Sequence, residues 1–287
     1  MRYQEAIRKG IMGMNLRNIA LIYPHNQRRY YQLADDKIKA KHILEQAQLA
    51  CAETYAIIER IGDIAPIWST MDRYKKIAIK PANGKGGGGI LILKKDSQGQ
   101  WCKGGKPVSN TYIFQHLANI LMGVFSLGSR DRVLIERCLE PHPFFQEIYP
   151  IGVPDFRIIL LKGEILMGML RVPTDRSDGK ANLHQGGLGI GLDLEKGVLT
   201  YAFDGKRYHT HHPDTDRIIQ GKKIPHWETL LQLAIDTAHA FPLDYLGIDI
   251  VLDESAGPLV MEVNVRPGLG IQLANKMGMQ KTLSNLY

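Results

Sequence analysis

Two apolar runs joined by a polar turn constrain the fold of this 287-residue chain more than any other segment. The runs are residues 246–252 and 259–264, and the residues between them include glycine and proline. Because apolar and polar side chains alternate along both runs, the segment predicts a β-hairpin. One face of this hairpin is expected to be buried and to carry Ile248, Ile250, Met261 and Val263.

Two carboxylates are predicted to oppose each other in this hairpin. If the turn is centred on Ser255 and Ala256, Asp249 lies across from Glu262, and Asn264 follows on the same face. Opposed carboxylates repel each other and destabilise the sheet unless a positive group lies between them. Oxygen ligands from Asp, Glu and Asn suit a hard cation, above all Mg²⁺, with phosphate oxygens completing the shell. The alternative is a solvated polar face on an edge hairpin.

The composition is that of a globular protein, with 44% hydrophobic and 23% charged residues. Such a chain can bury a core in one large or two smaller domains. The N-terminal residues lack an apolar signal segment, and no run approaches the length of a membrane span. Three cysteines without paired spacing favour a reduced, cytoplasmic compartment. The net charge of +7 is scattered and accompanies no nucleic-acid motif, so we expect no nucleic-acid partner, although a phosphate-bearing ligand fits the charge.

The remaining periodicity predicts helices and strands without regular βαβ alternation, which favours an α+β fold over a doubly wound sheet. Residues 1–34 are expected to be irregular, and Asp35 and Asp36 to begin the first helix. The predicted helices cover residues 37–47, 109–122, 225–240 and 269–277. The predicted strands outside the hairpin cover residues 55–58, 76–80, 89–93, 132–139, 155–162, 165–172, 187–193 and 198–202.

A glycine-rich loop separates two predicted strands. Lys80 ends the first strand, and five glycines follow between Gly84 and Gly89. The backbone N–H groups of such a loop can approach an anion closely, and the Lys80 ammonium can lie beside the same phosphates. A strand and not a helix follows, so the segment is not a Walker loop. An ordinary flexible hairpin loop is the alternative.

Two further segments carry charges on predicted strands. Glu136 lies near the end of an apolar strand, where it can face a purine edge, and a solvated strand residue is the alternative. Asp155 and Arg157 share one face of a later strand. Arg157, Arg171 and Lys180 offer the fixed positive charge that a transferring phosphoryl group needs. A simple ion pair between Asp155 and Arg157 is the alternative here.

Taken together, these segments resemble the ATP-grasp superfamily over roughly residues 35–278. The resemblance is greatest to its α-L-glutamate ligase-like or sugar-transfer-associated group, and it rests on residues 35–41, 155–157, 178–186 and 262–268. It implies an α+β fold with two lobes that clasp ATP. Residues 35–139 would form the lobe with the glycine-rich loop, and residues 140–287 the lobe with the Mg²⁺ site. Residues 1–34 would be a short segment, truncated relative to the domain that usually precedes this fold.

The resemblance also implies roles for individual residues. Those implied to bind ATP are Lys37, Lys80, Gly84, Gly86, Gly87, Gly88, Glu136, Leu139 and Asn182. Those implied to stabilise the transferred phosphoryl group or hold the substrate carboxylate are Arg157, Arg171, Lys180 and Arg266. Those implied to bind Mg²⁺, for which Mn²⁺ can substitute, are Asp249, Glu262 and Asn264.

The implied reaction is carboxylate–amine ligation. ATP would phosphorylate a carboxylate, and an amine would attack the acyl phosphate to give an amide or peptide-type bond, ADP and phosphate. The partners would be small-molecule or peptide carboxylates and amines, with glutamate or another amino acid as a candidate, and a homo-oligomer is compatible. A phosphotransferase of the same fold and a non-catalytic nucleotide-binding protein are the alternatives. The histidine cluster at residues 209–212 can be read as a metal site or, more simply, as a loop.

Overall fold

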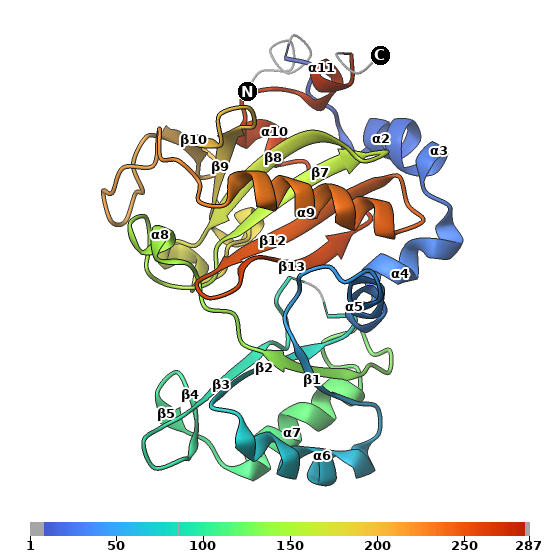
Figure 1. The fold of residues 1–287 in the computed structure, drawn as a ribbon, viewed down its shortest axis with the longest axis vertical. Helices are drawn as coiled ribbons and strands as arrows, with labels where there is room; N and C mark the ends of the chain where they lie inside the picture. Colours follow the sequence, from blue (N-terminus) through green and yellow to red (C-terminus); the bar gives the residue numbers. More distant parts are fainter. Residues whose placement is uncertain (1–8, 85, 285–287) are drawn as a thin grey trace. The chain divides into compact units, whose positions relative to one another are not determined.

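The computed structural model describes residues 9–84 and 86–284, which form two compact units (Figure 1). The larger unit contains the described residues up to Asp35, Lys39–Cys51 and the described residues from Glu140 onward. The smaller unit contains Asp36–Ile38 and Ala52–Leu139. The smaller unit thus ends at Leu139, and the described residues before Asp36 belong to the larger unit. Across the described ranges, no helix combines the length and apolar character that crossing a bilayer requires.

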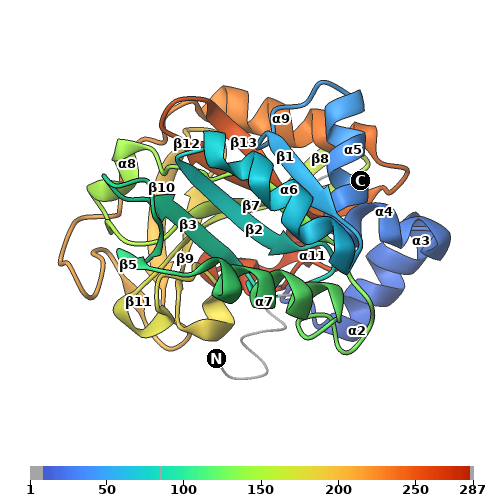
Figure 2. The same cartoon turned by 90° about the horizontal axis from the view of Figure 1, so that it is seen from below.

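The smaller unit is built on a six-stranded antiparallel sheet. Its strands, in the spatial order β1-β6-β2-β3-β4-β5, are β1 (Thr54–Ile58), β6 (Val133–Arg137), β2 (Lys76–Pro81), β3 (Leu91–Lys95), β4 (Trp101–Lys103) and β5 (Lys106–Pro107). Helices α6 (Ile64–Thr70) and α7 (Asn110–Leu121) lie against one face, as Figures 1 and 2 show. Alternate strand residues such as Ile77 and Ile79 pack there against Ile113 and Leu117. The opposite sheet face therefore carries the other set of side chains, including Lys80.

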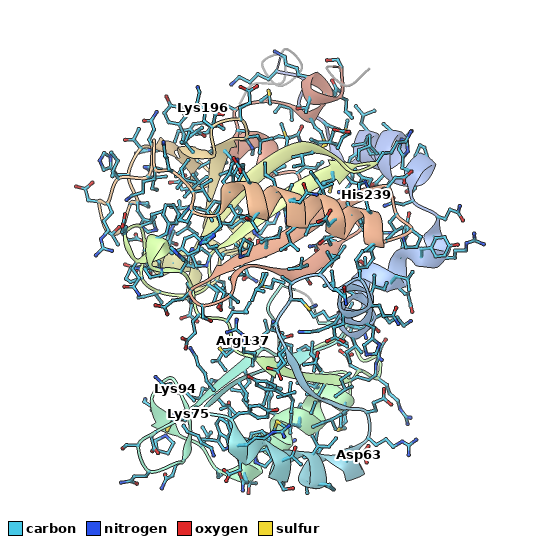
Figure 3. All side chains as sticks on the ribbon, in the orientation of Figure 1. Asp63, Lys75, Lys94, Arg137, Lys196 and His239 are labelled. Carbon is cyan, nitrogen blue, oxygen red and sulfur yellow. The ribbon has the colours of Figure 1, made fainter. Side chains whose placement is uncertain are left out.

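The larger unit contains a seven-stranded antiparallel sheet. Its strands, in the order β11-β10-β9-β8-β7-β12-β13, are β11 (Tyr208–His209), β10 (Val198–Phe203), β9 (Leu188–Asp193), β8 (Glu164–Val172), β7 (Asp155–Leu161), β12 (Tyr245–Asp253) and β13 (Gly257–Asn264). Helix α9 (Trp227–Ala240) crosses one face of this sheet (Figure 1). Gly163 turns the chain from β7 to β8 at φ +81°, and a Cβ there would lie 2.3 Å from Nε2 of His239 on α9 (Figure 3). A side chain at this turn would therefore push the helix away.

Most of the described segment before Asp36 is helical, so the prediction of an irregular segment is wrong. It contains α2 (Met14–Arg17), a π-helical turn (Asn18–Ile22), α3 (Tyr23–His25), a 3₁₀ turn (Arg28–Tyr30) and α4 (Tyr31–Asp35). The π-helical turn breaks the 3.6-residue period on which a helix prediction depends. Long-range contacts hold the segment instead: the Asn26 side chain bonds both the backbone N–H and the carbonyl of Tyr245.

Several predicted boundaries differ from the observed ones. Asp35 ends α4, and only Asp36 caps α5 (Lys37–Gln46), accepting a hydrogen bond from the Ile38 N–H at 3.0 Å. The predicted helix over residues 269–277 is reduced to α10 (Ile271–Ala274). After the N-terminal segment, the strands and α-helices that the sequence pattern missed are all short: β4, β5, β11, α6, α8 (Pro143–Gln146) and α11 (Met279–Leu283). Such short elements carry too few residues for a periodic signal.

Candidate active site

The β12–β13 hairpin has the register that its sequence predicts around the two carboxylates. Asp249 pairs with Glu262, and Gly247 pairs with Asn264. A β-bulge follows directly, because Ile250 pairs with Val260 and Met261 is the extra residue. Met261 is consequently half-buried, although the sequence predicted that it would lie on the buried face. Val260 is buried in its place.

Asp249 is fully buried, and two arginines surround its carboxylate. Arg157 donates from Nε to Oδ1 at 2.8 Å and from Nη2 to Oδ2 at 2.7 Å. Arg171 donates from Nη2 to Oδ2 at 2.7 Å, and the Asn264 amide donates to the same oxygen at 3.2 Å. Burial raises the pKa of Asp249, but the Arg157 and Arg171 charges outweigh it and hold that pKa below its usual range. Guanidinium groups thus supply the positive charge beside Asp249 in this structure, and the Glu262 charge also acts on Arg171.

A second buried carboxylate, Asp155, shares Arg171. Asp155 pairs with Arg171 across β7 and β8, and Asp249 pairs with Arg157 across β12 and β7. The alternative considered from the sequence was an ion pair between Asp155 and Arg157 on one strand, whereas here each aspartate pairs with an arginine of a neighbouring strand. Burial, together with the Asp249 charge, raises the pKa of Asp155 to about 6 despite the ion pair with Arg171. The pKa of Arg171 is raised, because the charges of Asp155 and Asp249 outweigh the effect of its own burial.

The donors near Asp249 fit a divalent cation in type. Asp249, Glu262 and Asn264 offer the oxygen ligands that Mg²⁺ prefers, and they lie on two paired strands. Within residues 9–84 and 86–284, however, no group of three or more His, Cys, Asp or Glu side chains is arranged to hold a metal ion. Asp249 already accepts from two arginines, and Asn264 turns its N–H toward it. A cation bound here would share Asp249 with the guanidinium groups or displace them.

In the smaller unit, Lys80 and Glu136 form an ion pair. Ala78 of β2 pairs with Glu136 of β6, so Lys80, two residues along β2, is its diagonal neighbour on the same face. The side chains are 13% and 6% exposed. The resemblance assigns Lys80 to the phosphates and Glu136 to the adenine, and the structure brings the two residues together.

The glycine-rich loop is held at both ends. The Lys37 ammonium donates to the Gly84 carbonyl at 2.8 Å, and the ring of His116 bonds the Gly89 carbonyl at 2.9 Å. Gly86, Gly87 and Gly89 have φ values of +61°, +77° and +77°, which other residues rarely adopt. The loop therefore depends on glycine for its path at these three positions.

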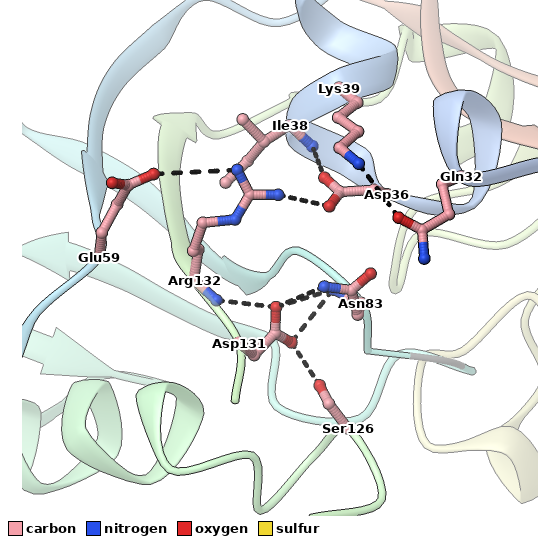
Figure 4. A network of polar contacts seen from close by, with 9 residues as sticks. All are labelled: Gln32, Asp36, Ile38, Lys39, Glu59, Asn83, Ser126, Asp131 and Arg132. Carbon is pink, nitrogen blue, oxygen red and sulfur yellow. Dashed lines mark hydrogen bonds and ion pairs between the residues drawn. The ribbon is translucent and has the colours of Figure 1, made fainter. Parts of the chain in front are cut away.

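The residue before Gly84 is fixed by a buried acid that the sequence did not indicate. Asp131 accepts from the Asn83 backbone N–H at 3.1 Å and from its side-chain amide at 2.9 Å, and it also bonds the Ser126 hydroxyl (Figure 4). The neighbouring Arg132 pairs with Asp36 at the start of α5 (Figure 4). No motif marks such lone acids, because their partners come from distant loops.

The other predicted residues lie outside the contacts of the Asp249 carboxylate. Lys180 is exposed, and Asn182 is half-buried with its Oδ1 accepting from the His184 N–H at 3.0 Å. Arg266 lies with its guanidinium carbon 4.8 Å from the centroid of the Tyr31 ring and makes an ion pair with Asp35 at 4.0 Å. Leu139 is buried as the last residue of the smaller unit.

Comparison with known protein families gives a match over almost the whole chain. A family model described as "Sugar-transfer associated ATP-grasp" matches residues 16–287. A probable α-L-glutamate ligase from Enterobacter sp. (strain 638) is 29% identical over 149 residues, which cover 49% of this chain and 38% of that protein. The aligned part thus spans about two fifths of that relative.

Solved structures show only distant similarity. A D-alanine–D-alanine ligase from Bacillus anthracis has a TM-score of 0.49 at 16% identity and covers 88% of this chain and 66% of its own. A D-Ala:D-Ser ligase from Enterococcus faecalis has a TM-score of 0.49 at 13% identity, with coverage of 88% and 61%.

Proposed function

Because this chain belongs to the sugar-transfer-associated ATP-grasp family, we propose that it is an ATP-dependent carboxylate–amine ligase. The observation that carries this proposal furthest is the buried cluster of Asp155, Arg157, Arg171 and Asp249. Burying so many charges is expensive, and replacing them with apolar residues often leaves stability unchanged or improved. A cluster of this kind is therefore better explained by chemistry than by stability. The name of the partial relative, a probable α-L-glutamate ligase, supports the same class of reaction.

Nucleotide binding is assigned to groups of the smaller unit. Lys80 and Lys37 supply positive charge for the phosphates, and the N–H groups of the glycine-rich loop supply hydrogen-bond donors. Glu136 and the backbone up to Leu139 hold the adenine. The pair of Lys80 and Glu136 fixes the lysine before ATP arrives, so less side-chain entropy is lost on binding.

Phosphoryl transfer is assigned to groups of the larger unit. Asp249, Glu262 and Asn264 hold Mg²⁺, which would neutralise phosphate charge when bound. Arg157 and Arg171 present fixed N–H donors to the carboxylate substrate or to the transferred phosphoryl group, and Lys180 and Arg266 add positive charge. The arginines are oriented in advance by Asp155 and Asp249, so they need no rearrangement of their own charges during the reaction.

The test is a screen for ADP release from ATP and Mg²⁺ in which acids and amines are varied separately. A ligase releases ADP over repeated turnovers only when both an acid and an amine are present, because the amine must consume the acyl phosphate, and its product has the mass of the two minus water. A phosphorylated product that persists when amines are supplied would instead identify a phosphotransferase. We expect Glu262→Gln to lose turnover while remaining folded, because Glu262 is half-buried and the change keeps the size of its side chain while removing the charge. Turnover equal to that of the parent would show that the metal assignment is wrong.

A further inference from the structure

The histidine cluster at residues 209–212 has no role in the proposed chemistry, yet one of its members is completely buried. His212 has no exposed surface, although it lies in a loop between β11 and α9. His209 pairs instead with Asp204 at 3.0 Å, and His211 is exposed. A buried polar ring in a loop requires partners for both of its nitrogens.

The partners of His212 fix its protonation state. Its Nε2 lies 3.0 Å from the Pro173 carbonyl, which can only accept, so Nε2 carries the proton. Its Nδ1 accepts from the Asp214 N–H at 3.2 Å, so Nδ1 carries none. The ring also stacks on Tyr149, with centroids 4.6 Å apart and planes 15° apart. The ring is therefore neutral, and each of its polar atoms is used.

The elements bonded to His212 form the base of the loop at residues 173–187, which carries Lys180 and Asn182. Tyr149 donates from its hydroxyl to the Asp175 carboxylate at 2.6 Å, and the Asp175 N–H donates to Asp214 at 2.9 Å. Two residues at the start of the loop, Pro173 and Asp175, are thus bonded to the group formed by His212, Tyr149 and Asp214.

From this base, local bonds shape the rest of the loop. The buried Thr174 and Ser177 form a reciprocal capping box, and the Lys180 N–H donates to the Ser177 carbonyl at 3.0 Å. The Thr174 hydroxyl donates to the Gly186 carbonyl at 2.8 Å and so closes the loop. These bonds connect the backbone around Lys180 to Thr174, so the position of Thr174 influences where Lys180 lies.

The far end of the loop lies beside the segment that follows Asn264. Leu183 directly follows Asn182, and its Cδ2 lies 3.2 Å from the position that a Cβ on Gly270 would occupy. Two residues earlier, a Cβ on Gly268 would lie 3.7 Å from Nη1 of Arg157. The loop thus reaches the chain segment that borders one of the two cluster arginines.

We propose that His212 is a positioning residue that holds the loop at residues 173–187 so that Lys180 and Asn182 are presented to the active site. That the loop presents Lys180 and Asn182 to the active site rests on the proposed function. That His212 holds the loop rests on the contacts of His212 alone. The ligand that the loop would contact is the triphosphate of a magnesium-bound nucleotide, because the family resemblance assigns Asn182 to ATP binding.

The same geometry makes the loop sensitive to acid. Burial lowers the pKa of His212, against the opposing effects of the Pro173 carbonyl, Asp214 and Asp175. The titratable groups that face its ring are Tyr149, Asp175, Asp214 and His209. With a lowered pKa, the folded loop stays unprotonated while an opened loop binds a proton near the ordinary histidine value of about 6.5. Acidification below that value therefore favours opening.

The first experiment measures hydrogen exchange of residues 174–187 by mass spectrometry in the full-length protein. His212→Phe keeps a ring to stack on Tyr149 but loses both hydrogen bonds, and it should speed exchange of these amides about tenfold. His212→Gln can keep the donor to the Pro173 carbonyl and should show a smaller increase. His211→Phe changes the exposed neighbouring histidine and is the matched control. Exchange in β12 and β13 should match the parent in all three and shows that each variant is folded.

Two further readouts separate positioning from folding. Exchange of the loop in the parent, corrected for the intrinsic rate, should rise between pH 7.5 and 5.5, and this rise should disappear in His212→Gln. The affinity for AMP-PNP with Mg²⁺, measured by calorimetry, should fall severalfold in His212→Phe and stay unchanged in His211→Phe.

Each outcome decides one part of the inference. If loop exchange in His212→Phe equals that in His211→Phe, His212 does not hold the loop. If the loop opens but nucleotide affinity is unchanged, the loop does not present groups to the nucleotide. If the parent itself binds no AMP-PNP, the proposed function fails together with the active-site role of the loop, while the exchange result still decides what holds the loop.

Discussion

The two charged regions of this protein are built in different ways. Asp155, Arg157, Arg171 and Asp249 all stand on central strands, and the spatial order β8-β7-β12 makes them neighbours. Around Lys80, an ion pair lies on one face of the sheet, and a loop follows the strand that carries Lys80. This loop is fixed at its ends, and its backbone conformation between them depends on glycine. The first region is fixed by sheet register, and the second by contacts at the two ends of a loop and by the backbone conformation of its glycines.

The difference also appears in how the charges are shared. Arg171 serves two buried carboxylates, Asp155 and Asp249, and Asp249 accepts from two arginines. Loss of one member therefore leaves several others uncompensated inside the protein. The ion pair of Lys80 and Glu136 joins one acid to one base, so loss of either residue leaves fewer buried charges uncompensated. We therefore expect changes in the first region to act mainly on folding, and changes in the second mainly on nucleotide binding.

The largest effect is expected for Arg171→Met. This change leaves Asp155 without its arginine and Asp249 with only Arg157, and the uncompensated buried charge should lower the free energy of unfolding by about 3–5 kcal/mol. Denaturant unfolding at pH 7.5 measures it. Adding Asp155→Asn to Arg171→Met should recover part of the loss, because one buried charge is removed. A double variant that is no more stable than Arg171→Met would show that the two residues are not coupled.

A smaller effect, on binding and not on folding, is expected for Lys80→Met. Removal of the ammonium should weaken binding of AMP-PNP with Mg²⁺ roughly tenfold or more, about 1.4 kcal/mol. Lys94→Met on the neighbouring strand β3 is the matched control, because Lys94 is exposed (Figure 3) and should leave affinity unchanged. Equal affinities for the two variants would remove Lys80 from the nucleotide site. If Lys80→Met lost as much stability as Arg171→Met, the two regions would not differ in their effect on folding.

The features that depend on residues close together in the chain could be predicted from the sequence. The pairing of Asp249 with Glu262 followed from alternation and turn length, and the glycine-rich loop from composition alone. The bonds of Arg157 and Arg171 to the two aspartates did not follow, because they require strands far apart in the sequence to lie side by side in a particular order. The β-bulge at Met261 was also missed, since an extra residue in one strand leaves the apolar alternation almost unchanged.

The N-terminal segment shows a second limit. Its helices carry no consistent apolar period, and they are held by single side chains that reach distant backbone. Arg17 donates to the Pro267 carbonyl at 2.8 Å, and the Gln272 side chain bonds both the N–H and the carbonyl of Met12. Contacts of this type depend on the completed fold, so no local pattern predicts them.

The smallest effect concerns the pH dependence of the buried cluster. Burial raises the pKa of Asp155 to about 6 in the folded protein, whereas an unfolded chain has an ordinary aspartate pKa of about 3.9. Between these values the folded state binds more protons at this site, so its contribution to stability grows as the pH falls from 7 toward 4. Asp155→Asn removes this proton uptake. The stability of the parent relative to Asp155→Asn should therefore increase over that interval, as measured by urea unfolding at four or more pH values. A difference that is flat, or that shrinks as the pH falls, would mean that Arg171 keeps Asp155 ionised. The cluster would then consist of two separate ion pairs, much closer in character to the pair of Lys80 and Glu136.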